Sequence, residues 1–262
     1  MSDVTPTMGP CPNPECGSSN ANATYPDDGH SWCYSCETYI GGDKSMQQTK
    51  VVPINNPATS ELKSVGQVAG IADRKITKET AQKYNTQVKV TNNIITHHIY
   101  QYFDKGGNHI ANKIREVQGK KFWSEGNLSS SGLFGQNVFG QAGKFVTVCE
   151  GEIDAMSAYE LLGSKWPVVS IKNGAASALE NCRQSFEYLN KFESVVLCFD
   201  NDKPGKEAAL KVAELFDPNK CKIVHLELKD ANEYLKTNQR KKFSDDWWNA
   251  TTFTPAGIVN LA

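Results

Sequence analysis

The sequence predicts an α/β protein with a small β ribbon, an α+β basic subdomain and a subdomain built on a parallel sheet, in that order. Three observations support this organisation. Four cysteines lie close together near the N-terminus, lysine and arginine are concentrated in the middle of the chain, and apolar segments alternate with helical segments in the C-terminal half.

The N-terminal cysteines form two pairs, Cys11-x4-Cys16 and Cys33-x2-Cys36. Four thiolates at this spacing suit one tetrahedral zinc ion, and a complete set of protein ligands indicates a structural site. A domain as short as residues 1–41 buries too little apolar surface to fold unaided, and zinc would contribute about 10–16 kcal/mol. The other cysteines are expected to be small buried side chains: Cys149, Cys182, Cys198 and Cys221.

Asp28, His30 and Trp32 lie just before the second cysteine pair, in the sequence DDGHSWC. Side chains of these types can stack on unpaired bases and hydrogen-bond to them. They can equally well brace the ribbon, and the spacing alone does not decide between the two. Residues 42–62, rich in Gly, Pro, Asn, Ser and Thr, are expected to be a flexible linker.

Residues 63–143 are predicted to form the basic subdomain. Residues 63–145 hold twelve Lys and Arg against five Asp and Glu, a net charge of +7, whereas residues 1–62 carry −5 and residues 146–262 carry −3. Such a basic block is typical of a phosphate-binding surface, although a solvated lysine-rich surface has the same composition. Within it we expect a helix over 75–85 with Thr77 as its N-cap, and a hairpin over 94–117 around the turn DKGGN.

Residues 144–240 are predicted to form a parallel sheet covered on both faces, because continuous apolar strands alternate with helices. We expect strands at 144–151, 166–172, 194–202 and 221–228, and helices at 152–163, 177–189 and 203–216. Residues 241–262 are expected to be a C-terminal tail, irregular from Trp247 onward.

Acidic residues follow the predicted parallel strands: Glu150, Asp200, Asp202 and Asp230. The carboxyl ends of such strands meet at one sheet edge, where ligand sites lie, and Asp154 is one helical turn beyond Glu150. Asp200 and Asp202 would point the same way on an extended strand end. Clustered carboxylates suit Mg²⁺ or Mn²⁺ and two-metal phosphoryl transfer. The alternative, acids favoured by helix dipoles, fits Glu152 and Asp154.

With EGEID followed some fifty residues later by DND, the sequence resembles the Toprim fold of primases, topoisomerases and some nucleases. Together with the DGH-containing four-cysteine ribbon, it is similar to the primase half of short-tailed-phage primase–helicases. FWSEG, LFGQ, the NGAASA loop, CFDNDKPGKEA and KDANE belong to this resemblance. It implies a small β zinc ribbon, an α+β basic subdomain and a Toprim-type parallel-sheet subdomain.

The resemblance also implies residue roles. Glu150, Asp200 and Asp202 would be catalytic, Glu150 as the acid–base or metal-ordering residue, with Asp154 and Asp230 completing the Mg²⁺ or Mn²⁺ ligands. Lys113, Arg115 and either Lys120 or Lys121 would hold nucleotides and template. In the ribbon, Asp28 and His30 would read a short sequence. The first cysteine pair departs from the family, which often has two intervening residues where this chain has four.

The implied activity is that of a DNA primase, which builds short RNA primers from ribonucleoside triphosphates on single-stranded DNA. A replicative helicase, fused or separate, and a DNA polymerase would be its partners, and this chain contains no GxxxxGK[ST] loop of its own. Two alternatives are a Toprim nuclease and a non-catalytic single-stranded-DNA-binding module that recruits a helicase.

The sequence also bears on location. The chain starts with neither the basic nor the apolar segment of a signal peptide, and no apolar run reaches the roughly 18–20 residues that span a bilayer. We therefore expect a protein of the infected host cytosol with no membrane association.

Overall fold

The computed structural model describes residues 6–26, 29–36, 38–41 and 61–255. The chain divides into two compact units, Met1–Thr59 and Ser60–Ala262. The linker predicted at 42–62 falls almost wholly outside the described residues. No helix among the described residues is long and apolar enough to cross a membrane.

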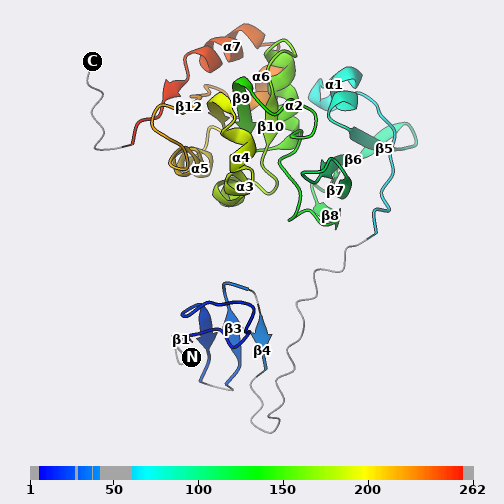
Figure 1. Cartoon of the computed structure of the whole chain (residues 1–262). Helices are drawn as coiled ribbons and strands as arrows, with labels where there is room; N and C mark the ends of the chain where they lie inside the picture. Colours follow the sequence, from blue (N-terminus) through cyan, green and yellow to red (C-terminus); the bar gives the residue numbers. More distant parts are fainter. Residues whose placement is uncertain (1–5, 27–28, 37, 42–60, 256–262) are drawn as a thin grey trace. The chain divides into compact units, whose positions relative to one another are not determined.

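The first unit contains a small antiparallel sheet (Figure 1). Its strands follow one another in sequence order: β1 (Thr7–Gly9), β2 (Asn22–Thr24), β3 (Ser31–Cys33) and β4 (Tyr39–Ile40). Only Ala23 and Cys33 are buried hydrophobic residues here among those described, so the sheet has almost no apolar core of its own.

The second unit begins with a four-stranded antiparallel sheet in the order β5-β6-β7-β8. A short 3-10 turn, η1 (Ala72–Arg74), and helix α1 (Lys78–Lys83) precede it, and its strands are β5 (Thr86–Thr91), β6 (Ile94–Phe103), β7 (His109–Glu116) and β8 (Phe122–Gly126). The Thr77 side chain accepts a hydrogen bond from the Thr80 amide, which confirms the predicted N-cap. The predicted hairpin is also confirmed, and it pairs on both sides with a further strand.

A mixed five-stranded sheet follows, in the order β10-β9-β11-β12-β13. Its parallel strands are β9 (Gly143–Cys149), β10 (Val168–Ser170), β11 (Phe192–Cys198) and β12 (Cys221–Ile223). The intervening helices are α2 (Glu152–Leu161), η2 (Ala175–Ser177), α3 (Ala178–Gln184), α4 (Phe186–Leu189) and α5 (Lys203–Ala213). The α/β class is therefore confirmed, although the helix expected at 177–189 is divided at Ser185 and the last parallel strand is shorter than expected.

Alternate residues of the central strands point to opposite faces of this sheet, as the strand period requires. Phe145 and Cys149 of β9 join a core that includes α2, whereas Val146 and Val148 join a core that includes α3 and α5. Helices therefore cover both faces (Figure 1). Burial on both faces explains why these strands are continuously apolar in sequence.

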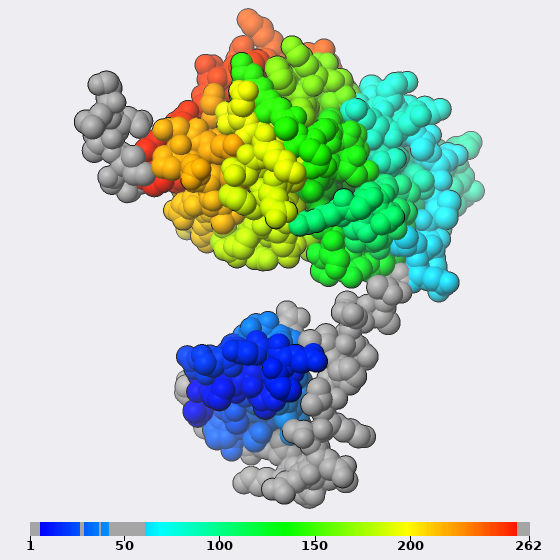
Figure 2. Space-filling model, viewed as in Figure 1, coloured from blue at the N-terminus to red at the C-terminus, as the bar shows by residue number. Residues whose placement is uncertain are grey.

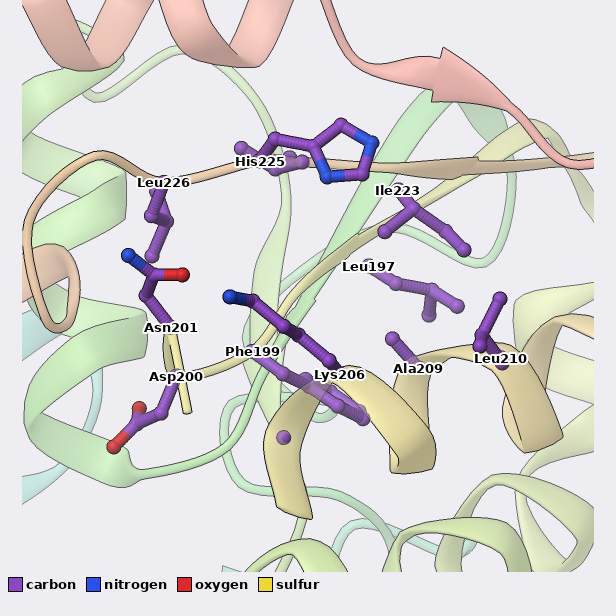
Figure 3. Close-up of a pocket in the computed structure, with 12 residues that line it drawn as sticks. Leu197, Phe199, Asp200, Asn201, Lys206, Ala209, Leu210, Ile223, His225 and Leu226 are labelled. Carbon is purple, nitrogen blue, oxygen red and sulfur yellow. The ribbon is translucent and has the colours of Figure 1, made fainter. Parts of the chain in front are cut away.

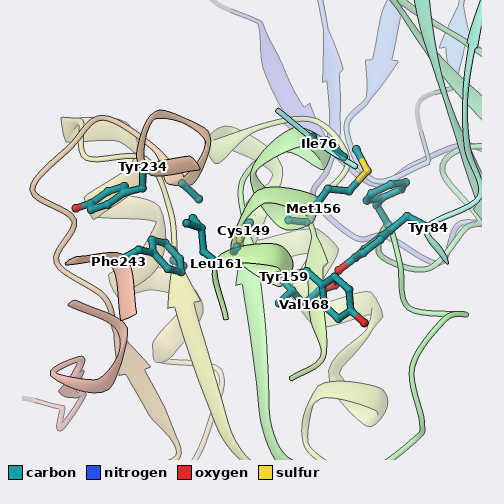
Figure 4. Close-up of a cluster of buried hydrophobic side chains, with 14 of the residues drawn as sticks. Ile76, Tyr84, Cys149, Met156, Tyr159, Leu161, Val168, Tyr234 and Phe243 are labelled. Atoms are coloured by element: carbon teal, nitrogen blue, oxygen red, sulfur yellow. The ribbon is translucent and has the colours of Figure 1, made fainter. Parts of the chain in front are cut away.

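The first of these two cores also belongs to the antiparallel sheet. Tyr84, Tyr100 and Tyr102 are about 1% exposed and lie in the same cluster as Met156 of α2. The Tyr84 hydroxyl donates a 2.8 Å hydrogen bond to the carbonyl of Val168 in β10. Figure 4 shows this cluster, with Tyr234 and Phe243 toward one end and Ile76 and Tyr84 toward the other. The segments from 61 to 255 consequently present one continuous body (Figure 2).

The expectation of an irregular tail from Trp247 is wrong for its first part. Residues after α6 (Ala231–Lys236) form helix α7 (Arg240–Trp248) and then β13 (Thr251–Thr252), which pairs antiparallel with β12. Phe243 and Trp247 are 0% and 2% exposed, and the Trp247 indole donates a 3.0 Å hydrogen bond to Thr147 Oγ1. Helix α7 is polar apart from these anchors, so its sequence gives little apolar periodicity.

We predict that Trp247→Ala lowers the free energy of unfolding of the second unit by about 3–5 kcal/mol, because it leaves a cavity beneath the sheet. It also leaves the buried Thr147 hydroxyl without its indole donor. Chemical denaturation followed by circular dichroism measures the loss. Lys241→Ala, on the exposed side of the same helix, is the control. Equal stabilities of the two variants would show that α7 is not part of the core.

Candidate functional site

Four of the predicted carboxylates come together at the carboxyl edge of the parallel sheet. Glu150 directly follows β9, and Asp200 lies two residues beyond the end of β11. Asp154 is in the first turn of α2, and Asp230 is the N-cap of α6, where its side chain accepts a hydrogen bond from the Glu233 amide. The sheet topology thus places four acids from three segments of the chain at one edge.

Two adjoining cavities, of about 420 and 430 Å³, lie at this edge. Both are lined by Asp154 and Asp200; Glu150 lines the first and Asp230 the second. Phe122 of β8 lines both as well, so the antiparallel sheet forms the opposite wall. The site therefore lies at the junction of the two sheets.

Glu150 has one oxygen with a partner and one without. The Ala175 amide donates a 3.1 Å hydrogen bond to Glu150 Oε1, from a loop that turns at Gly174 with a φ of +74°. Only glycine adopts this conformation readily, which explains the glycine in NGAASA. Glu150 Oε2 is buried and has no hydrogen-bond partner. A buried unpaired carboxylate oxygen is costly, so this atom fits the ligand set of a divalent cation.

Burial raises the pKa values of these carboxylates, and their mutual repulsion adds to the effect. The pKa of Asp200 is raised to about 7 by burial and by the negative charges of Glu150 and Asp230, against which Lys229 acts. The pKa of Asp154 is raised well above its usual range by burial and by Asp230 and Asp200. The pKa of Glu150 is raised mainly by burial. The cluster has an excess of negative charge that a cation would neutralise.

Asp202 has a different surrounding from the other predicted carboxylates. It is exposed, lines neither cavity, and serves as the N-cap of α5 by accepting a 2.8 Å hydrogen bond from the Gly205 amide. That Asp200 and Asp202 point the same way stays a prediction. The charge of Asp202 acts on the cluster, since it is among the causes that raise the pKa values of Glu150 and Asp200. A Cβ at Gly205 would lie 2.4 Å from the Asp200 carbonyl oxygen, which shows how tightly α5 begins against Asp200.

Lys113 is held inside the protein by an ion pair. Its ammonium lies 2.7 Å from Glu152 Oε1 and also donates to the Lys172 carbonyl at 2.5 Å. The Tyr102 hydroxyl donates to the same Glu152 oxygen at 2.6 Å. Glu152, read from sequence as an ordinary helix acid, is 4% exposed and joins β6 and β7 to α2. It lines both cavities, and Lys113 lines the first. In the sequence, the only indication that Glu152 has such a role is its position two residues after Glu150 in EGEID.

The remaining predicted basic residues separate into two groups. Arg115 and Lys120 line the second cavity, whereas Lys121 lines neither. Sequence reasoning did not single out Arg74 and Lys229, which line the second cavity too. Lys229 Nζ lies 3.5 Å from Asp230 Oδ2. The signal for Lys229 was present in KDANE, directly beside the predicted acid.

The four N-terminal cysteines are brought together as predicted. Their sulfur atoms all lie within 4.8 Å of one another, with Cys11 and Cys36 3.6 Å apart and Cys16 and Cys33 3.8 Å apart. Zinc–sulfur bonds of about 2.3 Å in a tetrahedron place the sulfurs about 3.8 Å apart, so the cluster has the size that zinc requires. Thr38 Oγ1 lies 3.0 Å from Cys36 Sγ, and this contact chiefly lowers the pKa of Cys36, to about 6.

An aromatic group surrounds His30 in the same unit. The His30 ring stacks on Tyr25 with centroids 4.5 Å apart and lies 5.7 Å from Tyr39. Tyr39 and Tyr34 are 52% and 61% exposed. Trp32 is half-buried on β3, and Asp28 lies outside the described residues. The tyrosines were not predicted, although aromatic residues near DGH could have indicated a stacking surface.

Comparisons with known proteins agree with this arrangement. A family model described as Toprim-like matches residues 147–235. A DNA helicase/primase of Enterobacteria phage T3 is 32% identical over 259 residues, covering 96% of this chain and 45% of that protein. The crystal structure of the primase fragment of the bacteriophage T7 primase-helicase matches with a TM-score of 0.67 and 31% identity, covering 94% of this chain and 100% of that one. The chain belongs to the primase family of phage primase–helicases.

A second solved structure extends the comparison. It contains the T7 lagging-strand DNA polymerase interacting with primase domains of two gp4 subunits bound to an RNA/DNA hybrid and dTTP. It matches with a TM-score of 0.65 and 32% identity, covering 72% of this chain and 94% of that one. The resemblance to the primase half is confirmed. The chain spans about half the length of its T3 relative.

The raised pKa of Asp200 predicts a pH-dependent stability of the protein in EDTA. The unfolded carboxyl has a pKa of about 3.9, so folding binds a proton between about pH 4 and 7, and Asp200 lowers stability as the pH rises through that range. We therefore expect the melting temperature of Asp200→Asn, relative to wild type, to increase between pH 4.5 and 7.5.

Calorimetry at several pH values measures this difference. His98, whose burial lowers its pKa to about 4, contributes the opposite slope in both proteins and cancels in the comparison. Asp217→Asn, an exposed aspartate, should follow the wild type. A constant difference between Asp200→Asn and wild type would show that Asp200 titrates normally.

For the cysteine cluster, we predict that the protein binds one zinc ion and that Cys33→Ser removes it. All four ligands lie in the first unit, so thermal unfolding of the second unit should stay unchanged. Metal analysis of dialysed protein and differential scanning calorimetry measure both effects. Ser35→Ala, between the two ligands of the second pair, is the control. Full zinc content in Cys33→Ser would contradict the four-cysteine site.

Proposed function

We propose that this chain is a DNA primase, a nucleotidyltransferase that builds short RNA primers from ribonucleoside triphosphates on single-stranded DNA. The observation that carries the proposal is the carboxylate cluster at the junction of the two sheets, with the unpaired Glu150 Oε2 among its atoms. Family membership supports the same reaction.

Glu150, Asp154, Asp200 and Asp230 would hold Mg²⁺ or Mn²⁺, because hard oxygen ligands suit these ions. Such ions stabilise the charge that develops in phosphoryl transfer. Glu150 would order the ion and act as the acid–base residue, since burial raises the pKa of its carboxyl. Asp202 would be a further catalytic residue and ligand of the ion, and its charge is among the causes that raise the pKa values of Glu150 and Asp200.

The cations beside this cluster would hold the phosphates of nucleotides and template. Arg115, Lys120 and Arg74 line the second cavity together with the acids Asp154, Asp200 and Asp230. Arg115 lies over the Phe122 ring, with its guanidinium carbon 5.9 Å from the ring centre, which restricts its motion. Lys113 would act mainly as support, because Glu152 and the Lys172 carbonyl already occupy its ammonium. Lys121 would contact the strand farther out.

The ribbon would hold structural zinc and read a short DNA sequence through Asp28, His30 and Trp32. Tyr34 and Tyr39 add exposed rings next to His30, and bases stack on such rings with about 1–3 kcal/mol each. The aromatic stack of Tyr25 on His30 would hold the imidazole in a fixed orientation.

A replicative helicase and a DNA polymerase would be the partners. The T3 relative, described as a helicase/primase, is more than twice the length of the matched region, and the T7 structure contains a polymerase interacting with primase domains. The reaction would take place in the host cytosol.

A priming assay tests the activity. Single-stranded DNA of mixed sequence, all four ribonucleotides and Mg²⁺ or Mn²⁺ should give short template-dependent RNAs. Asp200→Asn should lower the rate of synthesis about 100-fold or more, because it removes charge that holds the ion. Asp217→Asn is the matched control and should prime normally. Template binding should be nearly unchanged in both, because the cationic residues remain.

Other products would overturn the proposal in distinct ways. DNA degradation without ribonucleotides would indicate a Toprim nuclease. Tight binding of single-stranded DNA without either product, even with a partner helicase added, would indicate a recruiting module. Normal priming by Asp200→Asn would leave the activity in place but reject the assigned site.

A further inference from the structure

A third cavity lies on the other side of the 199–201 segment from the carboxylate cluster. It has a volume of about 360 Å³ and lies between helix α5 and the chain from Ile223 to Leu226 (Figure 3). None of the residues assigned to zinc, primer synthesis or template binding lines it, apart from Asp200. The Asp200 carboxylate points away from the other labelled side chains in Figure 3, so only its main-chain side belongs to this cavity.

The walls of the cavity are apolar. Leu197 of β11 and Ile223 of β12 form the sheet side, and Ala209 and Leu210 of α5 form the helix side. Ala209 is 2% exposed, and its small side chain leaves space that a larger residue would fill. Two apolar walls that face each other in this way suit a ring with two apolar faces.

Three polar side chains lie around the opening: the Asn201 amide, the Lys206 ammonium and the His225 imidazole (Figure 3). No hydrogen bond or ion pair involves these three side chains within the part of the chain that the structure describes. The backbone of Asn201 is fixed, because its main-chain N–H donates a 2.7 Å hydrogen bond to the Lys229 carbonyl. An apolar cavity with a few unpaired polar groups at its opening is typical of a small-molecule site.

We propose that this cavity binds a free nucleoside phosphate, separate from the nucleotides at the carboxylate cluster. The base would lie between the walls formed by Ile223 and Ala209. The side-chain carboxamide of Asn201, which offers both a donor and an acceptor, would form hydrogen bonds with the edge of the base. Lys206 would bind the phosphates, with His225 beside them. A carboxamide and an ammonium around one apolar slot match a base and its phosphate better than a purely apolar ligand.

The position of this site gives it a connection to the catalytic cluster. Asn201 follows Asp200 directly, and its backbone N–H donates a hydrogen bond to the carbonyl of Lys229, the residue before Asp230. A ligand that fixes Asn201 would therefore restrict the two segments that carry these acids. The site goes beyond the proposed function, and its occupancy does not require priming activity.

Binding of ATP in EDTA tests the proposal. Without divalent cations the carboxylates repel a triphosphate, so binding at the cluster is suppressed. Heteronuclear NMR of the full chain should show ATP-dependent amide shifts at Asn201, Lys206, Ala209 and His225. Adenosine should shift the amides near Ala209 and Ile223 more weakly, and inorganic triphosphate should shift mainly those of Lys206 and His225.

Variants then distinguish this site from the cluster. Lys206→Gln and Asn201→Ala should each raise the Kd for ATP about tenfold, which corresponds to loss of one charge-assisted or base-edge hydrogen bond. Ala209→Leu should abolish the shifts by filling the slot, with its folding checked by spectral dispersion. Lys211→Gln, exposed on the same helix, and Asp154→Asn, in the cluster, should bind like wild type.

Three results would overturn the proposal: no shifts in these segments at millimolar ATP, shifts confined to residues 150–154 and 229–230, or shifts unaffected by all three pocket variants. Shifts caused by a single-stranded oligonucleotide but not by ATP would assign the cavity to a base in a strand and reject a free nucleotide. Failure of any kind leaves the priming assay, which uses different variants, unaffected.

Discussion

The placement of several carboxylates side by side at one sheet edge is the constraint on which the second unit depends. At 4 Å, two such charges repel by about 4 kcal/mol at an effective dielectric of 20, and burial adds a desolvation cost to each. Burial is the main cause of the raised pKa values of Glu150, Asp154 and Asp200, and the repulsion between the carboxylates raises them further. The fold tolerates it because β9 and β11, which lead into Glu150 and Asp200, are buried on both faces.

The two sheets of this unit depend on each other at the same place. The antiparallel sheet contributes Tyr102 and Lys113, which surround the buried Glu152 of α2. Removing Tyr102 or Lys113 would leave the buried Glu152 carboxylate without one of these two partners, which lowers stability. Helix α7 stabilises the chain before Asp230. The Tyr234 hydroxyl donates a hydrogen bond to Asp246 of α7 and accepts hydrogen bonds from the backbone amides of Glu227 and Leu228. These hydrogen bonds hold the loop that leads to Asp230.

The first unit depends on a different interaction. Its strands are two or three residues long, and the described residues give it almost no apolar core. Coordination of one ion by the four cysteine thiolates would replace the hydrophobic stabilisation that such a segment lacks. Its aromatic rings are then available at the surface, around His30, because they are not needed to form a core.

The sequence by itself determined the features that depend on local pattern. The spacing of four cysteines defined the metal cluster, and strand–helix alternation defined the parallel sheet and the edge at which Glu150, Asp200 and Asp230 meet. These follow from ligand chemistry and from the chirality and period of strands, which short segments already encode. The motif resemblance added the family, which comparison confirmed.

Only the tertiary structure decided what depends on partners distant in sequence. Glu152 became a buried ion-pair residue because β6 and β7 bring Tyr102 and Lys113 to it, and Asp202 became the N-cap of α5 by accepting a hydrogen bond from the Gly205 amide. Helix α7 was missed for the same reason. Six of its nine residues are polar, and only Phe243 and Trp247 are buried. Its Trp247 finds Thr147 one hundred positions away, and no local period records a contact of that kind.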